Sequence, residues 1–237
     1  MPRHVHVIFS IALLLPVIAL GLRGAAPLAR AQAMSAAAKT DDRLPDNFPG
    51  LAKAAGEPQL PGLTIVYLHP LGNPADANRW ENIIVHQTEG PEGSAKSLAM
   101  AQAKNPSKRG VTLWVESDGT VYWSTAENAI PTHGDGANRN DNKYIDNSKT
   151  HGRVVKTNSI GVEFVGNYPD VAKPASPAQV QAWLLLVRFL QERYGIPAER
   201  IYAHNWIDYK DHRYCEGCEL ATLARALAYQ PGQTAQR

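Results

Sequence analysis

The sequence predicts an α/β domain with a central mixed β-sheet flanked by helices. Two observations indicate this class: short β-branched segments recur between turn residues, and segments with helical periodicity stand among them. Strand-like and helix-like segments alternate along the chain, which favours helices packed on the faces of one sheet. We therefore assign one domain to residues 62–237 of the 237-residue chain.

The strand-like segments are rich in Val, Ile and Thr and are bounded by Pro, Gly and Asn. They cover residues 64–68, 82–86, 111–115, 120–123, 159–165 and 200–204. The third and fourth segments flank Asp118-Gly119, a pair typical of tight turns, so we expect a hairpin there. Residues 126–158 are rich in Asn, Asp, Gly and Lys, and we interpret them as a long functional surface loop.

For one helix, the sequence predicts both the first and the last residue. Ser176 and Gln179 form a capping box, with a proline at the first helical position. Apolar residues follow at the spacing of one buried face until Gly195 ends the helix. Shorter helices are predicted over residues 94–104 and 220–229.

Residues 1–33 are expected to be a signal peptide. The apolar run over residues 7–22 follows a positively charged start, and it is short for a bilayer span of about 20 residues. Ala31-Gln32-Ala33 is a small-x-small cleavage pattern. Cleavage would place the mature chain in the periplasm or outside the cell, without stable membrane insertion. The alternative is an uncleaved membrane anchor.

Residues 34–61 lack apolar periodicity and are rich in Ala, Pro, Gly, Asp and Lys, so we interpret them as a flexible linker or arm. The formal net charge of the chain is +2, and the expected signal peptide carries three arginines and no acidic residue. The mature chain is therefore close to neutral. This balance argues against a nucleic-acid partner, which would require a basic excess.

Two histidines end predicted strands, His86 after residues 82–85 and His204 after residues 200–203. Strand ends that lead into loops are where a rigid sheet presents ligands. The segment after His204 collects acids, bases, a further histidine and both cysteines, without apolar periodicity. The C-x-x-C spacing of Cys215 and Cys218 fits either a disulfide or a metal site.

The chain resembles the zinc-dependent N-acetylmuramoyl-L-alanine amidases of the type 2 family, which includes the peptidoglycan recognition proteins. The resemblance covers about residues 82–220, and its pieces occur in the family's order. They are IIVHQTEG, SDGTVYW, NSIGVEFVGN, SPAQVQAW and IYAHNW. The resemblance implies an enzyme that hydrolyses the amide bond between the lactyl group of N-acetylmuramic acid and the L-alanine of the stem peptide.

The family holds zinc with two histidines and an aspartate or cysteine, and leaves the fourth position to water. His86 and His204 match the two histidines. Residues 213–217 match the family's third-ligand segment best, which implies Cys215 as the ligand. This register requires an insertion of one to three residues after His204 and puts Arg213 in the place of the usual lysine.

A second register of the same resemblance keeps the shorter spacing after the second histidine. It puts Lys210 in the lysine position and His212 in the ligand position, and Asp211 is a further alternative. A disulfide between Cys215 and Cys218 would favour these alternatives over Cys215.

The resemblance also implies the catalytic roles. Glu163 aligns with the general base of the bacterial members, and an unpaired carboxylate in a central strand would otherwise be costly to bury. It would take a proton from the zinc-activated water and pass it to the leaving amine. Arg213, or Lys210 in the other register, would stabilise the oxyanion. His133 stands where family members have a histidine that lines the substrate groove.

The expected substrate is peptidoglycan or a soluble muropeptide, and we expect a monomer. Two other classes of protein compete with the enzyme. One is a peptidoglycan-binding receptor of the same fold without catalysis. The other is a thiol redox protein built on Cys215 and Cys218, although no strand precedes that motif as it does in thioredoxin-like folds.

Overall fold

A computed structural model describes residues 57–74, 80–134, 136–137, 139, 145–209 and 213–227. The expected signal peptide and most of the expected arm lie outside these residues, as do Lys210, Asp211 and His212. No helix in the described ranges has the length and apolar character needed to cross a membrane.

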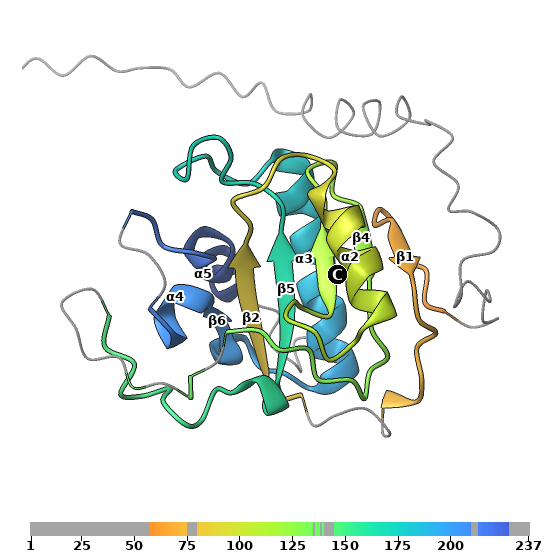
Figure 1. Ribbon diagram of the computed structural model, residues 1–237. Helices are drawn as coiled ribbons and strands as arrows, with labels where there is room; N and C mark the ends of the chain where they lie inside the picture. Colours follow the sequence, from red (N-terminus) through yellow and green to blue (C-terminus); the bar gives the residue numbers. More distant parts are fainter. Residues whose placement is uncertain are drawn as a thin grey trace, which may run out of the picture. The chain divides into compact units, whose positions relative to one another are not determined.

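Six strands form one mixed sheet in the order β1-β4-β3-β5-β2-β6 (Figure 1). The strands are β1 (Ile65–Tyr67), β2 (Asn82–Gln87), β3 (Leu113–Val115), β4 (Val121–Trp123), β5 (Ser159–Phe164) and β6 (Ile201–Ala203). Strands β3 and β4 pair antiparallel, as the hairpin expected at Asp118-Gly119. The other neighbouring strands pair in parallel. The predicted mixed sheet is confirmed.

The helices pack on this sheet, with α2 on the near side and α3 behind it in Figure 1. They are α2 (Ser94–Lys104), α3 (Pro177–Tyr194), α4 (His204–Ile207) and α5 (Cys218–Ala226), with short 3₁₀ turns η2 (Lys156–Asn158) and η3 (Ala198–Arg200). The last predicted strand, residues 200–204, is one residue too long at each end, because Arg200 belongs to η3 and His204 begins α4.

Helix α3 begins at the predicted capping box. The hydroxyl oxygen of Ser176 accepts a hydrogen bond from the backbone N–H of Gln179 at 3.0 Å, and the Gln179 side chain accepts one from the Ser176 N–H at 3.0 Å. The Gln179 amide also donates to the carbonyl of Val165 at 2.6 Å, just after β5. The cap therefore fixes the start of α3 against the sheet as well as satisfying its first N–H groups.

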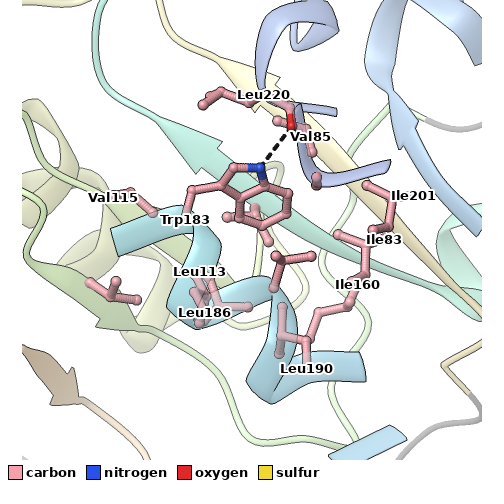
Figure 2. Packing of buried hydrophobic residues seen from close by; sticks show 14 of the residues in the cluster. Ile83, Val85, Leu113, Val115, Ile160, Trp183, Leu186, Leu190, Ile201 and Leu220 are labelled. Carbon is pink, nitrogen blue, oxygen red and sulfur yellow. Dashed lines mark hydrogen bonds between the residues drawn. The ribbon is translucent and has the colours of Figure 1, made fainter. Parts of the chain in front are cut away.

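The main core lies between the sheet and helices α3 and α5 (Figure 2). Its largest part is made by alternate residues of β2, β3 and β5 that pack against Trp183, Leu186 and Leu190 of α3. The indole N–H of Trp183 donates to the carbonyl of Leu220 at 2.8 Å, which ties α3 to α5. Since strand residues alternate between faces, the residues between the core residues of β2 and β5 point to the opposite face.

A buried ion pair holds the loop before β2 against the end of α3. The Arg193 guanidinium donates to both carboxylate oxygens of Glu127, at 2.7 and 2.8 Å, and to the carbonyl of Gly72 at 2.8 Å. The side chains are only 13% and 3% exposed, and Tyr194 donates to the same carboxylate. The Gly72 N–H donates to Glu127 at 2.8 Å, so Gly72 is hydrogen-bonded to both members of the ion pair.

Replacing Glu127 with alanine is expected to lower the free energy of unfolding by about 3–5 kcal/mol, because it leaves the Arg193 guanidinium buried without its carboxylate. The matched control is Glu192→Ala, which breaks the exposed pair with Arg188 and is expected to cost less than about 1 kcal/mol. Urea denaturation at pH 7 measures both variants. Equal small losses would show that the buried pair does not stabilise the fold.

Candidate metal centre

His86 and His204 lie together at one edge of the sheet. His86 belongs to β2, and His204 directly follows β6, which pairs with β2 in parallel. Parallel neighbours end at the same edge of a sheet, so the two rings come close. Their Nδ1 atoms are 3.1 Å apart, and both side chains are buried. The structure thus brings together the two histidines that the sequence singled out.

The third donor beside these rings is Glu216, which the sequence analysis did not consider. Its Oε1 lies 3.3 Å from Nδ1 of His86 and 3.0 Å from Nδ1 of His204. Glu216 is only 1% exposed. The three donor atoms lie within 4.8 Å of one another, and imidazole nitrogen and carboxylate oxygen are both zinc ligands in proteins.

The expected third ligand, Cys215, requires a correction. Cys215 forms a disulfide with Cys218, so it has no thiolate to offer to a metal ion. It is also exposed, whereas the next residue, Glu216, is buried against the two histidines. The alternatives that the resemblance left open, His212 and Asp211, lie outside the described residues, as does Lys210.

Gly217 holds Glu216 in place by lying directly on β2. Its φ is 79°, and a Cβ atom at this position would lie 2.2 Å from the carbonyl oxygen of Val85. Its N–H donates to the side chain of Gln87 at 2.9 Å, and the Gln87 backbone N–H donates to Glu216 at 3.4 Å. Only a glycine allows both this conformation and this approach. The carboxylate therefore reaches the histidines because the next residue has no side chain.

His133 lies against His86, away from Glu216. Nδ1 of His133 is 3.3 Å from Nε2 of His86, and its own Nε2 is 3.2 Å from the carbonyl oxygen of Ser159. His133 is only 8% exposed, and the two rings meet edge to face. Protein groups therefore contact both of its ring nitrogens, and its place in a substrate groove stays a prediction.

In the predicted surface loop over residues 126–158, the described residues are partly buried, and some of them lie against the site. A Cβ atom on Gly134 would lie 1.9 Å from Nε2 of His204, so this glycine packs directly against the ring. The side chain of Asn147 donates to the carbonyl of Ile207 at 2.8 Å and holds α4. Val154 packs with Ile207 in a small apolar cluster on the sheet. The loop therefore positions His204 in addition to covering the sheet.

Glu163 lies next to His86 on the same face of the sheet. The two residues are register partners in the parallel β2–β5 ladder, and Trp114 of β3 is the partner of Glu163 on the other side. Directly paired residues of parallel strands point to the same face. The structure thus places the half-buried Glu163 in a central strand, beside a candidate ligand.

Arg213 lies at the exposed rim, three residues before Glu216. Its guanidinium nitrogen Nη2 is 3.1 and 3.3 Å from the two carboxylate oxygens of Glu89, in the loop that follows β2. This ion pair links the segment before the disulfide to the end of the strand that carries His86.

The electrostatics favour the protonation states that bind a metal ion. Burial, together with the neighbouring His204, lowers the pKa of His86 to about 3. Burial by itself would raise the pKa of Glu216, but a hydrogen bond from His204 and the contact with the His86 ring hold that pKa below its usual range. A neutral imidazole and an ionised carboxylate are the forms that metal ions bind.

The metal-free protein is expected to lose stability as the pH falls from about 6.5 towards about 3. In this range the unfolded chain protonates His86 whereas the folded protein does not, so acid favours unfolding. Glu216 acts in the same direction below its ordinary pKa of 4.5. Urea midpoints at pH 7 and pH 4.5, with chelator present, measure the loss.

His86→Gln removes one of the two groups and should reduce this pH dependence. His151→Gln, in an exposed turn, serves as the control. A His86→Gln variant with the pH dependence of the unmodified protein would contradict the assignment.

Several solved structures are similar to this chain. They include the N-acetylmuramoyl-L-alanine amidase LysC from Clostridium intestinale URNW, with 17% identity over 69% of this chain and 97% of that chain and a TM-score of 0.47. The Ph2119 endolysin from Thermus scotoductus MAT2119 bacteriophage Ph2119 is 20% identical over 61% of this chain and 82% of that chain, with a TM-score of 0.40. Drosophila PGRP-LB is 14% identical over 70% of this chain and 94% of that chain, with a TM-score of 0.43.

A search of curated protein sequences found no match. The sequence profile of one family, described as N-acetylmuramoyl-L-alanine amidase (Amidase_2), matches residues 76–218. This range is more than half of the chain and contains His86, Glu163, His204 and Glu216. Together with the buried group of donors at the sheet edge, the match identifies the chain as a member of the N-acetylmuramoyl-L-alanine amidase family.

Proposed function

We propose that this chain is a zinc-dependent N-acetylmuramoyl-L-alanine amidase that acts on peptidoglycan. It would hydrolyse the amide bond between the lactyl group of N-acetylmuramic acid and the L-alanine of the stem peptide. The observation that carries the proposal is the convergence of His86 Nδ1, His204 Nδ1 and Glu216 Oε1 within 4.8 Å. Family membership supports the peptidoglycan substrate.

The donor set fits a catalytic zinc ion. Two imidazole nitrogens and one carboxylate oxygen are three protein ligands, which is the number that leaves a position open for water or substrate. The low pKa of Glu216 keeps a negative charge in a buried place, and a cation would compensate that charge. Zinc, when bound, supplies Lewis acidity that activates water and polarises the substrate carbonyl.

Glu163 is the proposed general base. Its position as the register partner of His86, on the same face of the sheet, supports this role. There it would accept a proton from the attacking water and deliver it to the leaving amine of L-alanine. Both transfers use the same carboxylate, so Glu163 is ionised again at the end of each cycle.

Arg213 is the proposed electrostatic partner of the oxyanion that forms on the lactyl carbonyl. A guanidinium stays charged at neutral pH and does not act as an acid, so its role would be charge stabilisation. Its ion pair with Glu89 ties the segment that leads to Glu216 to the loop after β2. Lys210 is the alternative residue for this role.

We also propose that the protein is exported and works in the periplasm or outside the cell. The expected signal peptide over residues 1–33 is one argument. The disulfide between Cys215 and Cys218 is a second, because disulfides persist in oxidising compartments.

Purified protein is expected to carry zinc and to release new L-alanine amino termini from isolated peptidoglycan. Glu163→Gln should keep the zinc and lose at least about 100-fold in rate, because it removes the general base without touching a ligand. Mass spectrometry of the fragments and metal analysis measure the two properties. Glu192→Gln, on the exposed side of α3, is the control and should retain full activity.

Removal of zinc with a chelator should abolish activity, and added zinc should restore it. A protein that bound peptidoglycan but released no amino termini would instead be a receptor of this fold. A Glu163→Gln variant that digested the wall at the unmodified rate would remove Glu163 from the mechanism.

Glu216→Gln is expected to weaken zinc binding by more than about 100-fold, since loss of an outer-shell partner alone typically costs 10- to 100-fold. Cys215→Ser should retain zinc, because the structure gives this residue no place among the donors. Glu219→Gln, an exposed glutamate three residues further on, is the matched control. Competition with a chromophoric chelator measures the affinities. Zinc loss in Cys215→Ser with retention in Glu216→Gln would reverse the assignment.

A further inference from the structure

His133 lies against Nε2 of His86, whereas the other donors face Nδ1, and the proposed mechanism does not use it. Its ring lies over Gly161 of β5, where a Cβ atom would come within 3.3 Å of Nδ1 of His133. From there the ring spans the distance between the carbonyl of Ser159, at the start of β5, and the ring of His86. The absence of a side chain at position 161 provides the space for it.

The carbonyl of Ser159 determines which ring nitrogens of His133 and His86 carry hydrogen. A carbonyl oxygen only accepts hydrogen bonds, so Nε2 of His133 must carry the hydrogen in this contact. A charged ring would be costly in this buried place beside two other imidazoles, so His133 is neutral and its Nδ1 is an acceptor. The partner of that acceptor is Nε2 of His86, which must therefore be the donor.

A neutral His86 that carries its hydrogen on Nε2 has a lone pair on Nδ1. This atom lies 3.3 Å from Oε1 of Glu216 and 3.1 Å from Nδ1 of His204. In the metal-free protein the hydrogen among these three atoms then lies on Nδ1 of His204, which is 3.0 Å from Glu216 and can donate to both neighbours. The opposite tautomer of His86 would place a hydrogen on its Nδ1 and block it as a ligand atom. Ordinary metal sites orient a histidine through a carboxylate, carbonyl or water at its second nitrogen. In this protein a second imidazole stands between His86 and the backbone carbonyl.

We propose that His133 is a positioning residue that holds His86 in the Nε2–H tautomer and so keeps Nδ1 available for a divalent metal ion. The inference rests on the proposed metal centre, but it concerns a property of the metal-free protein that can be measured separately. An apolar residue of similar size would fill the same space. It would leave the buried N–H of His86 without an acceptor and the tautomer undetermined.

The direct test is nuclear magnetic resonance of the metal-free full chain with ¹⁵N-labelled histidine at neutral pH. Two-bond ¹H–¹⁵N correlations distinguish the tautomers, and His86→Gln and His133→Gln spectra assign the two rings. Both rings are expected to carry hydrogen on Nε2. A hydrogen on Nδ1 of His86 would overturn the proposal. This measurement needs no variant of uncertain stability and no catalytic activity.

The second test is the zinc affinity of two variants at position 133, measured by chelator competition. His133→Leu is expected to weaken binding by about 10- to 100-fold. His133→Gln should restore most of the affinity, since an amide has both an acceptor and a donor. His151→Gln is the control for loss of a histidine elsewhere, and circular dichroism verifies that each variant is folded.

These outcomes separate the inference from the proposed function. If the unmodified chain binds zinc and His133→Leu binds it equally well, the positioning role is wrong and the amidase proposal stands. If the unmodified chain binds no zinc, the proposed function fails, and the tautomer of His86 still decides whether His133 orients it. Unfolding of His133→Leu would leave the spectrum of the unmodified protein as the deciding measurement.

Discussion

The candidate site depends on the pairing of β2 in parallel with β5 on one side and with β6 on the other. Parallel pairing brings the ends of all three strands to one edge of the sheet. It also makes Glu163 the register partner of His86 and places His204 one residue beyond the last pair. Three residues from distant parts of the chain are thus positioned by the backbone hydrogen bonds of one sheet.

The alternation of strand residues divides this sheet into a structural and a chemical face. On one face, Ile83, Val85 and their neighbours bury apolar surface against α3 and α5. On the other, the same strands present His86 and Glu163, with Gly161 leaving space for a buried imidazole. Burial on the first face therefore stabilises the backbone that holds the polar groups on the second.

The segment from Cys215 to Cys218 supplies the third donor through backbone contact and not through its sulfur atoms. The disulfide closes a short loop, and Gly217 inside it lies against the carbonyl of Val85. This contact holds the segment against β2, where Glu216 lies beside the two histidines. The donor from this segment is thus the carboxylate of Glu216, whereas the expected thiolate of Cys215 is part of the disulfide.

Local patterns in the sequence determined much of this protein. They predicted the hairpin, the capped helix, most strand positions and the placement of His86, His204 and Glu163 on or beside strands. These features depend on periodicity and turn chemistry, which neighbouring residues report. The burial of His133 inside a polar loop was missed, because it results from contacts with Gly161 and Ser159 rather than from its own neighbours.

Only the tertiary structure decided which residue after His204 meets the two imidazoles. That segment contains several competent ligand types and no periodicity, so its path cannot be derived from local preference. The path is set by the close approach of Gly217 to β2 and by the bond between Cys215 and Cys218. The sequence by itself therefore determined the two strand-borne histidines and the carboxylate of the central strand. The position of Glu216 was decided by long-range packing, because it depends on a loop held against a strand far away in the chain.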